Sequence, residues 1–455
     1  MIWKKHSYTL VLIAVSIVIR TLLFIFTDPV ITKDASDPGG YISVANNISS
    51  LDFSDYDGGR TPGYPFIISL AGFNYAAVVL LQMCMGILIG VLLLKITHRL
   101  TGNKPVSFLA GLSYSLYLPF LNREILIATE TAAIFFLTLS FYLFLLFLSE
   151  LNNKKISYLF LLTSLGAASI TALIRPLYLL LYYFLAAGIL FVLLIKNTDL
   201  KKIIPLMLLI LLPNLVFIQG WSFVNYQTTG KYCLSSWSGM SLSNKAGMFM
   251  ESAPEEYDAL KKHFIRHRDE KLSSQGTHLL SAWLAFEDMQ EETGLSDAEL
   301  IEQIKRMSIA AIKEEPGLYL KGVIADWFTF WKPIGLYQDY GRTASVIKLI
   351  EHRALWIVIF LFFGYPVFYL FARRFRKSGS LSFEHAGLTS VFYLLVLACS
   401  GACAILELGN RRFSLVTDPL LIIIVVTLIY NFWTSVYFSP VRLRIVSFLS
   451  GGKKE

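Results

Sequence analysis

Charged residues are scarce in this chain: Asp, Glu, Lys and Arg make up only 16% of its 455 residues. Hydrophobic residues account for 55% and aromatic residues for 14%, and the mean hydropathy is +0.58. A water-soluble domain could not bury that much apolar surface. The composition therefore predicts a polytopic membrane protein embedded in a lipid bilayer.

The chain also lacks the basic stripe and the cysteine pattern that would indicate other classes of protein. Its net charge is +8, but the Lys and Arg residues are spread over the ends of hydrophobic runs, so no nucleic-acid partner is expected. The four cysteines follow neither a disulfide framework nor a zinc spacing. We expect no cofactor and no dedicated metal site.

Hydrophobic runs of spanning length predict about ten transmembrane helices. They lie at residues 7–27, 75–97, 106–121, 126–149, 156–173, 177–195, 203–224, 354–372, 386–406 and 413–437. Lys4 and Lys5 precede the first run, and alternate connections carry most of the basic residues. The positive-inside rule therefore predicts a multi-pass protein of the cytoplasmic membrane with both termini in the cytoplasm.

A long polar segment separates two hydrophobic modules. The predicted units are an N-terminal transmembrane module at 1–224, an outer insertion at 225–352 and a C-terminal transmembrane module at 353–455. Within the insertion, residues 255–315 are typical of polar amphipathic helices, with Ser296 and Glu299 spaced as a capping box. Residues 316–334 begin with a proline and carry one apolar face, which predicts a helix lying in the membrane interface.

The first predicted outer loop, residues 28–65, places two carboxylates and an arginine beside a transmembrane helix. Asp34 and Asp37 are three residues apart, a spacing that puts both on one face of a helix. The alternative is a solvated turn in which Asp37 caps a helix beginning at Gly39. Arg60 opens the rigid bend Arg-Thr-Pro-Gly-Tyr-Pro, where it could bind a lipid phosphate or extend into the interface as an ordinary arginine.

Later outer segments carry further charged residues. Glu130 lies at the start of a predicted span, where a carboxylate is unfavourable unless it faces a wet cavity or contacts a helix terminus. Arg175 precedes Pro176 at an outer break between two runs. Arg411 and Arg412 occupy a short outer turn that disfavours positive charge, so a partner is expected. Glu407 is one candidate partner, and an anionic ligand is the other.

Five segments follow one another along the chain in a recognisable order. They are D-x-x-x-Y-x-x-x-A-N-N-I at 37–48, RTPGYP at 60–65, IATETA around Glu130, LIRP at 173–176 and ELGNRRFSLVTDP at 407–419. Together they resemble polyprenyl-phosphate-dependent glycosyltransferases of the GT-C fold, in particular the family that includes protein O-mannosyltransferases and aminoarabinose transferases (glycosyltransferase family 39-like). The resemblance implies an all-α, GT-C-like membrane protein with outer juxtamembrane helices and a mostly helical outer insertion.

The same resemblance implies an enzyme that moves a sugar from a polyprenyl-phosphate donor to a hydroxyl of a lipid, glycan or protein acceptor. Transfer would occur on the outer, periplasmic side of the membrane by inverting displacement. Asp37 maps onto the catalytic base, with Asp34 as the alternative. The residues mapped to the donor phosphate are Arg60 and Arg411 or Arg412. We expect the sugar and acceptor site to include Tyr41, Tyr64, Glu130, Arg175 and Glu407.

Other functions remain open at this stage. A transporter or flippase of an anionic lipid-linked sugar would also carry outer charges, although no internal repeat is evident in the sequence. An O-antigen ligase or polymerase would use diphosphate-linked donors and rely on arginines in its long outer loop, whereas here the first loop carries the acidic residues. A divalent ion between Asp34, Asp37 and Glu130 is a further option that no ligand spacing demands.

Overall fold

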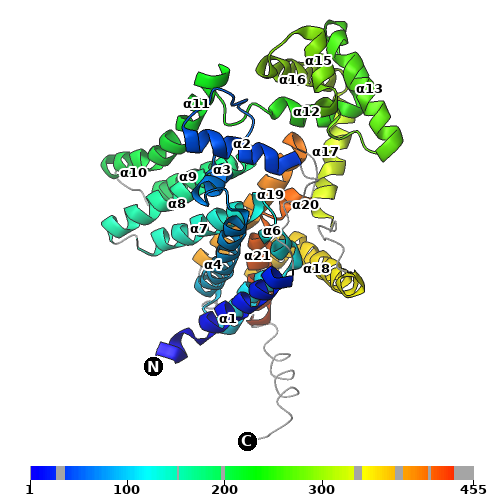
Figure 1. The fold of residues 1–455 in the computed structure, drawn as a ribbon. Coiled ribbons are helices and arrows are strands. Elements are labelled where there is room, and N and C mark those ends of the chain that lie inside the picture. Colours follow the sequence, from blue (N-terminus) through cyan, green and yellow to red (C-terminus); the bar gives the residue numbers. More distant parts are fainter. Residues whose placement is uncertain are drawn as a thin grey trace, which may run out of the picture.

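The computed structural model describes residues 2–26, 36–150, 153–195, 200–332, 341–374, 383–407 and 411–434. All secondary structure within these ranges is helical, as predicted (Figure 1). Seven described helices are long and apolar enough to cross a membrane, so the chain is a multi-pass membrane protein. They are Ser7–Phe26, Tyr75–Thr101, Glu130–Ser149, Lys155–Ile174, Ile204–Thr229, Leu349–Val367 and Thr389–Leu406.

The remaining three predicted spans are shorter in the structure. The run at 106–121 divides into α5 (Lys104–Leu116) and α6 (Leu118–Glu124), with an extended Tyr117 between them. Pro119 in the first turn of α6 favours this new start, because proline suits the beginning of a helix. The runs at 177–195 and 413–437 contain the apolar helical stretches Pro176–Leu190 and Asp418–Trp433. The count of about ten spans therefore stays a prediction.

The helices form a bundle with a separate helical insertion at one end (Figure 1). Besides α5 and α6, the bundle contains α1 (Ile2–Phe26), α4 (Tyr75–Thr101), α7 (Glu130–Ser149), α8 (Lys154–Ile174), α9 (Leu179–Ile195), α10 (Leu200–Pro213), α11 (Gly220–Thr229), α18 (Gly341–Arg374), α19 (Phe383–Leu406) and α21 (Asp418–Thr434). Short elements beside them are α2 (Ser36–Ser50), α3 (Gly63–Leu70), the 3₁₀ turn η1 (Pro176–Tyr178), the π-helical η2 (Asn214–Gln219) and α20 (Arg411–Ser414).

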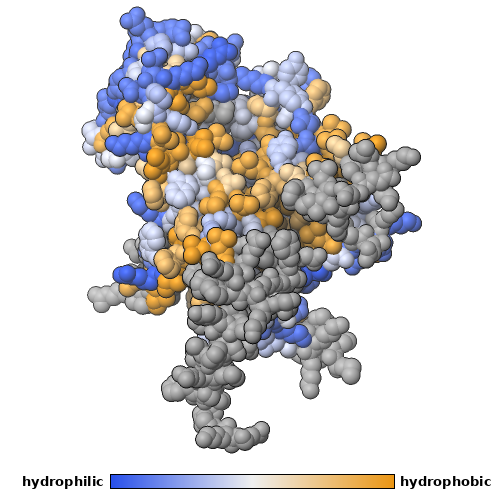
Figure 2. All heavy atoms as spheres, turned by 180° about the vertical axis from the view of Figure 1, so that it is seen from behind, coloured by the Kyte–Doolittle hydropathy of each residue, from blue (hydrophilic) through white to orange (hydrophobic). Residues whose placement is uncertain are grey.

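The insertion has a hydrophobic core of its own. Its elements are α12 (Ser238–Ala246), η3 (Gly247–Ser252), η4 (Glu255–Tyr257), α13 (Asp258–Gln275), α14 (Ser281–Leu284), α15 (Phe286–Thr293) and α16 (Asp297–Glu314). Phe264, Met289 and Ile304 are among the residues buried within it. The predicted capping box is confirmed, since the Ser296 backbone N–H donates to Glu299 Oε2 over 3.1 Å. Figure 2 shows hydrophilic residues gathered over the insertion and hydrophobic residues over the bundle beneath it.

Helix α17 (Pro316–Trp331) joins the insertion to the bundle. It begins with Pro316, as predicted, and packs along α19 (Figure 1). Phe330 and Trp331 are buried, and Trp327 donates its indole N–H to Ser400 Oγ over 3.1 Å. The interfacial orientation expected for this segment stays a prediction.

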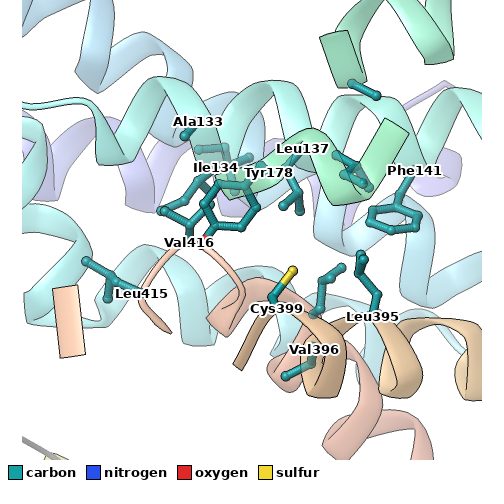
Figure 3. Close-up of a cluster of buried hydrophobic side chains, with 14 of the residues drawn as sticks. Ala133, Ile134, Leu137, Phe141, Tyr178, Leu395, Val396, Cys399, Leu415 and Val416 are labelled. Atoms are coloured by element: carbon teal, nitrogen blue, oxygen red, sulfur yellow. The ribbon is translucent and has the colours of Figure 1, made fainter. Parts of the chain in front are cut away.

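The core of the bundle brings the C-terminal helices over the beginning of α7. Ala133, Ile134, Leu137 and Phe141 of α7 follow a helical spacing that puts them on one face with Glu130. Figure 3 shows this face packed against side chains of α19 and against the segment leading into α21, among them Leu395, Val396, Cys399, Leu415 and Val416. As a result, the turn at 411–414 lies close to Glu130, the first residue of α7.

A buried ion pair links α1 to α6. Arg20 donates from Nε and Nη2 to the two carboxylate oxygens of Glu124, over 2.7 Å in each case. The two side chains are 2% and 0% exposed. Gly86 of α4 leaves the necessary space, since a Cβ there would lie 2.1 Å from Glu124 Oε1.

Replacing Arg20 by methionine is expected to destabilise the protein by about 3–5 kcal/mol, because it leaves Glu124 buried without its cation. The double variant Arg20→Met/Glu124→Gln should recover most of that loss, since no uncompensated charge remains. Thermal unfolding of the detergent-solubilised variants measures both. A double variant as unstable as the single one would contradict this role for the pair.

Candidate functional site

A buried cluster of charges forms where α7, α8 and α20 meet. The Glu130 carboxylate is fully buried, accepts a hydrogen bond from Arg412 Nε and lies 3.7 Å from Arg175 Nη2. Arg123 is within electrostatic reach of the same carboxylate. Glu130 opens α7, where the positive end of the helix dipole also favours a negative charge. The sequence-predicted residues Glu130, Arg175 and Arg412 are thus brought together from distant parts of the chain.

Arg175 directly follows the last residue of α8, and the proline after it fixes its backbone conformation. The residue before a proline is disfavoured in helical conformation, and Arg175, which precedes Pro176, is extended with φ −142° and ψ 106°. Its Nη1 donates to the Arg412 carbonyl over 3.5 Å, and its guanidinium lies 5.1 Å from the centre of the Phe413 ring. The Tyr178 hydroxyl donates to the Phe413 carbonyl over 2.8 Å. These contacts join the LIRP segment to the turn at 411–414.

The bend at residues 60–65 packs against the same end of α8. A Cβ on Gly63 would come within 2.7 Å of the Leu173 backbone carbon and 2.8 Å of the Ile174 nitrogen, so only glycine permits this approach. The next residue, Tyr64, is buried and donates to Gln82 Oε1 over 2.9 Å. Burial, followed by the nearby Tyr41 and Glu130, raises the pKa of Tyr64 well above its usual value. The Tyr64 ring also packs edge-on against the Tyr41 ring, with 5.3 Å between their centres.

Arg60 is held between two aromatic rings. Its guanidinium carbon lies 4.5 Å from the centre of the Tyr41 ring and 4.5 Å from that of Trp237, and Nη1 donates to the Tyr41 hydroxyl over 3.1 Å. Such cation–π contacts orient a guanidinium without neutralising it. Arg60 is accordingly a positioned cation, in contrast to an arginine extending freely into the interface.

Trp237 comes from the insertion, and polar contacts fix it against the first loop. Its indole N–H donates to Asp57 Oδ2 over 3.2 Å. Ser235 and Ser236 donate their hydroxyls to the carbonyls of Gly59 and Asp57 over 2.6 and 3.0 Å. Sequence reasoning missed Trp237 as a site residue, because no local pattern links it to Arg60.

Glu407 contacts the insertion, and a pair between Glu407 and Arg411 stays a prediction because the Arg411 side chain lies outside the described residues. Glu407 accepts a hydrogen bond from Ser241 Oγ of α12 over 3.1 Å, whereas Arg412 pairs with Glu130. Burial raises the pKa of Glu407, while the Ser241 hydrogen bond, Arg175 and Lys245 act in the opposite direction. Glu407 therefore connects the insertion to the C-terminal end of α19.

The structure describes the backbone at Asp37, the residue that the sequence resemblance maps onto the catalytic base. Helix α2 begins at Ser36, so Asp37 lies in its first turn and does not cap a helix starting at Gly39. Residue 37 precedes Tyr41 by one helical turn. Asp34 lies outside the described residues, and so do the side chains of Asp37 and Arg411.

The described residues contain no group of three or more His, Cys, Asp or Glu side chains arranged to hold a metal ion. A cation site shared by Asp34, Asp37 and Glu130 stays a prediction, because it includes side chains outside the described part. Comparison with known proteins finds no matching family model, no matching curated protein and no matching solved structure.

Proposed function

We propose that this protein is a membrane glycosyltransferase that moves a sugar from a polyprenyl-phosphate donor to a hydroxyl acceptor, with a GT-C-like arrangement of its helices. The observation that supports this proposal is the meeting of separate motif segments at one end of the bundle. Gly63 packs on Leu173 and Ile174, and Arg175 and Arg412 share the carboxylate of Glu130. The aromatic-clamped Arg60 belongs to the same bend as Gly63.

The chemistry of the proposed reaction suits these residues. A sugar on polyprenyl phosphate already has a good leaving group, so the enzyme needs cations that stabilise the departing phosphate more than it needs a general acid. Arg60 and Arg412 would supply that positive charge, and Glu130 would orient Arg412. Asp37 would accept the proton of the acceptor hydroxyl as that oxygen attacks the anomeric carbon from the opposite side.

The proposal is tested with purified protein in liposomes, supplied with labelled polyprenyl-monophosphate hexose and pentose donors and with lipid and glycan fractions as acceptors. We expect a glycosidic product that depends on Arg60 and is reduced about 100-fold or more in Arg60→Met, the effect of losing one transition-state donor. Arg306→Met makes the same change at an exposed position of α16 and serves as the matched control.

Two other results would contradict this function, and a third would contradict the role of Arg60. Movement of the donor across the bilayer without a product would favour a transporter. Reaction with diphosphate-linked donors alone would favour an O-antigen ligase-like enzyme. A product formed equally well by Arg60→Met would remove the assigned phosphate contact.

A further inference from the structure

A second cluster of cations lies at the opposite end of the bundle from Glu130. It surrounds a pocket of about 400 Å³ whose lining includes Tyr8, Lys95, His98, Arg99, Lys104 and Tyr142. Tyr142 lies 12 residues after Glu130 on α7, or about 18 Å along the helix axis. The pocket is therefore distinct from the charge cluster described above, and it lies at the end that the positive-inside rule predicts to face the cytoplasm.

The fold gathers these cations around one aromatic ring. Lys95 Nζ lies 5.5 Å and the Arg99 guanidinium carbon 5.9 Å from the centre of the Tyr142 ring. The turn after α4 is tight, since Gly102 adopts φ 66° and Asn103 caps α5 through the Val106 N–H, so that Lys104 follows Arg99 closely. Tyr8 of α1 packs on Phe108 of α5 at 5.7 Å and closes one side.

Within the part of the chain that the structure describes, these basic side chains have no carboxylate partner. Lys95, Arg99 and Lys104 form no ion pair with any described residue, and Arg99 Nη1 donates a hydrogen bond to Ser149 Oγ over 3.3 Å. The buried Nδ1 of His98 has no hydrogen-bond partner in this part of the chain. Like charges four residues apart on a helix repel one another, so Lys95 and Arg99 on one face favour an anion between them.

An apolar surface leads away from the pocket along α4. Leu81 and Leu88 precede Lys95 by four turns and two turns at heptad spacing, which puts all three on one face of the helix. Leu81 is 41% exposed and Leu88 is 49% exposed. A ligand with an anionic head and a hydrocarbon tail fits this combination, whereas a free phosphate would use only the pocket.

We infer that the pocket binds the phosphate group of an anionic membrane lipid, with the lipid tail lying along α4. Lys95, Arg99 and Lys104 contact the phosphate oxygens, and the Tyr142 ring holds the first two cations in place. Basic pockets between transmembrane helices on the cytoplasmic side are suited to anionic headgroups for this reason. This inference is independent of the proposed sugar transfer, since none of these residues contacts the Glu130 cluster.

The test compares lipid retention by the wild type and by Lys95→Gln/Arg99→Gln. Each purified protein is incubated with phosphatidylglycerol or phosphatidylcholine in detergent micelles, and bound lipid is counted by native mass spectrometry. We expect the wild type to retain phosphatidylglycerol selectively and the double variant to bind it about 30-fold more weakly, at roughly 1 kcal/mol for each basic residue. Both substituted residues are exposed, so the variant should fold normally.

Lys155→Gln/Lys321→Gln removes the same charge at two exposed positions outside the pocket and should retain the lipid. Equal loss in this control would assign the effect to net charge and overturn the inference, as would full retention by the pocket variant. A second experiment adds inorganic phosphate at millimolar concentration to the protein with bound phosphatidylglycerol. If the phosphate displaces phosphatidylglycerol completely, the site recognises free phosphate and the lipid assignment is wrong.

Discussion

Changing Asp37 to asparagine is expected to lower the rate of sugar transfer by about 10²–10⁴-fold, the usual contribution of a positioned general base. Residue 37 lies in the first turn of α2, one turn before Tyr41, whose ring and hydroxyl contact Arg60. The substitution keeps the size of the side chain and removes its basicity, so kcat should fall while KM for the donor changes little. Steady-state transfer from a polyprenyl-phosphate sugar measures both constants.

Two further substitutions make the result specific to this carboxylate. Asp55→Asn makes the same change at an exposed position in the same loop and should leave kcat unaltered. Asp34→Asn separates the two candidate bases. If Asp34→Asn abolishes transfer while Asp37→Asn remains active, the base is Asp34, and if both variants remain active, neither residue is the base.

The sequence predicts the membrane helices well because hydropathy is a local property. Runs such as 75–97 and 126–149 correspond to the spans Tyr75–Thr101 and Glu130–Ser149. The run at 106–121 is also of spanning length, but it divides at Tyr117, after which α6 begins with Pro119 in its first turn. Hydrophobicity alone does not predict the break between α5 and α6.

The candidate site is harder to predict from the sequence than the membrane helices are, because its contacts depend on tertiary packing. The positive charge of Arg412 predicted a partner, and Glu407, only five residues away, was the nearest carboxylate in the chain. The observed partner, Glu130, is reached because α19 and the segment leading into α21 pack on the apolar face of α7 (Figure 3). Trp237 illustrates the same limit, since its contact with Arg60 joins the insertion to the first loop.

Changing Glu130 to glutamine is expected to reduce both stability and transfer. The variant leaves Arg175 and Arg412 close together without the buried carboxylate that they share, which should cost about 3–5 kcal/mol of unfolding free energy. Because Arg412 is proposed to stabilise the leaving phosphate, its misplacement should also lower kcat by about 100-fold. Thermal unfolding in detergent and transfer kinetics below the unfolding temperature measure the two effects separately.

Glu292→Gln provides the matched control, since Glu292 forms an exposed ion pair with Lys262 on the insertion surface. Exposed pairs contribute about 0–1 kcal/mol, so this control should remain nearly as stable as the wild type. The double variant Glu130→Gln/Arg175→Gln distinguishes a structural cluster from a functional one. Removing one of the two cations should restore part of the stability, but Arg412 would still lack the carboxylate that orients it. Recovery of transfer in step with stability would therefore show that Glu130 only supports the fold, whereas stable but inactive protein would support its role in positioning Arg412.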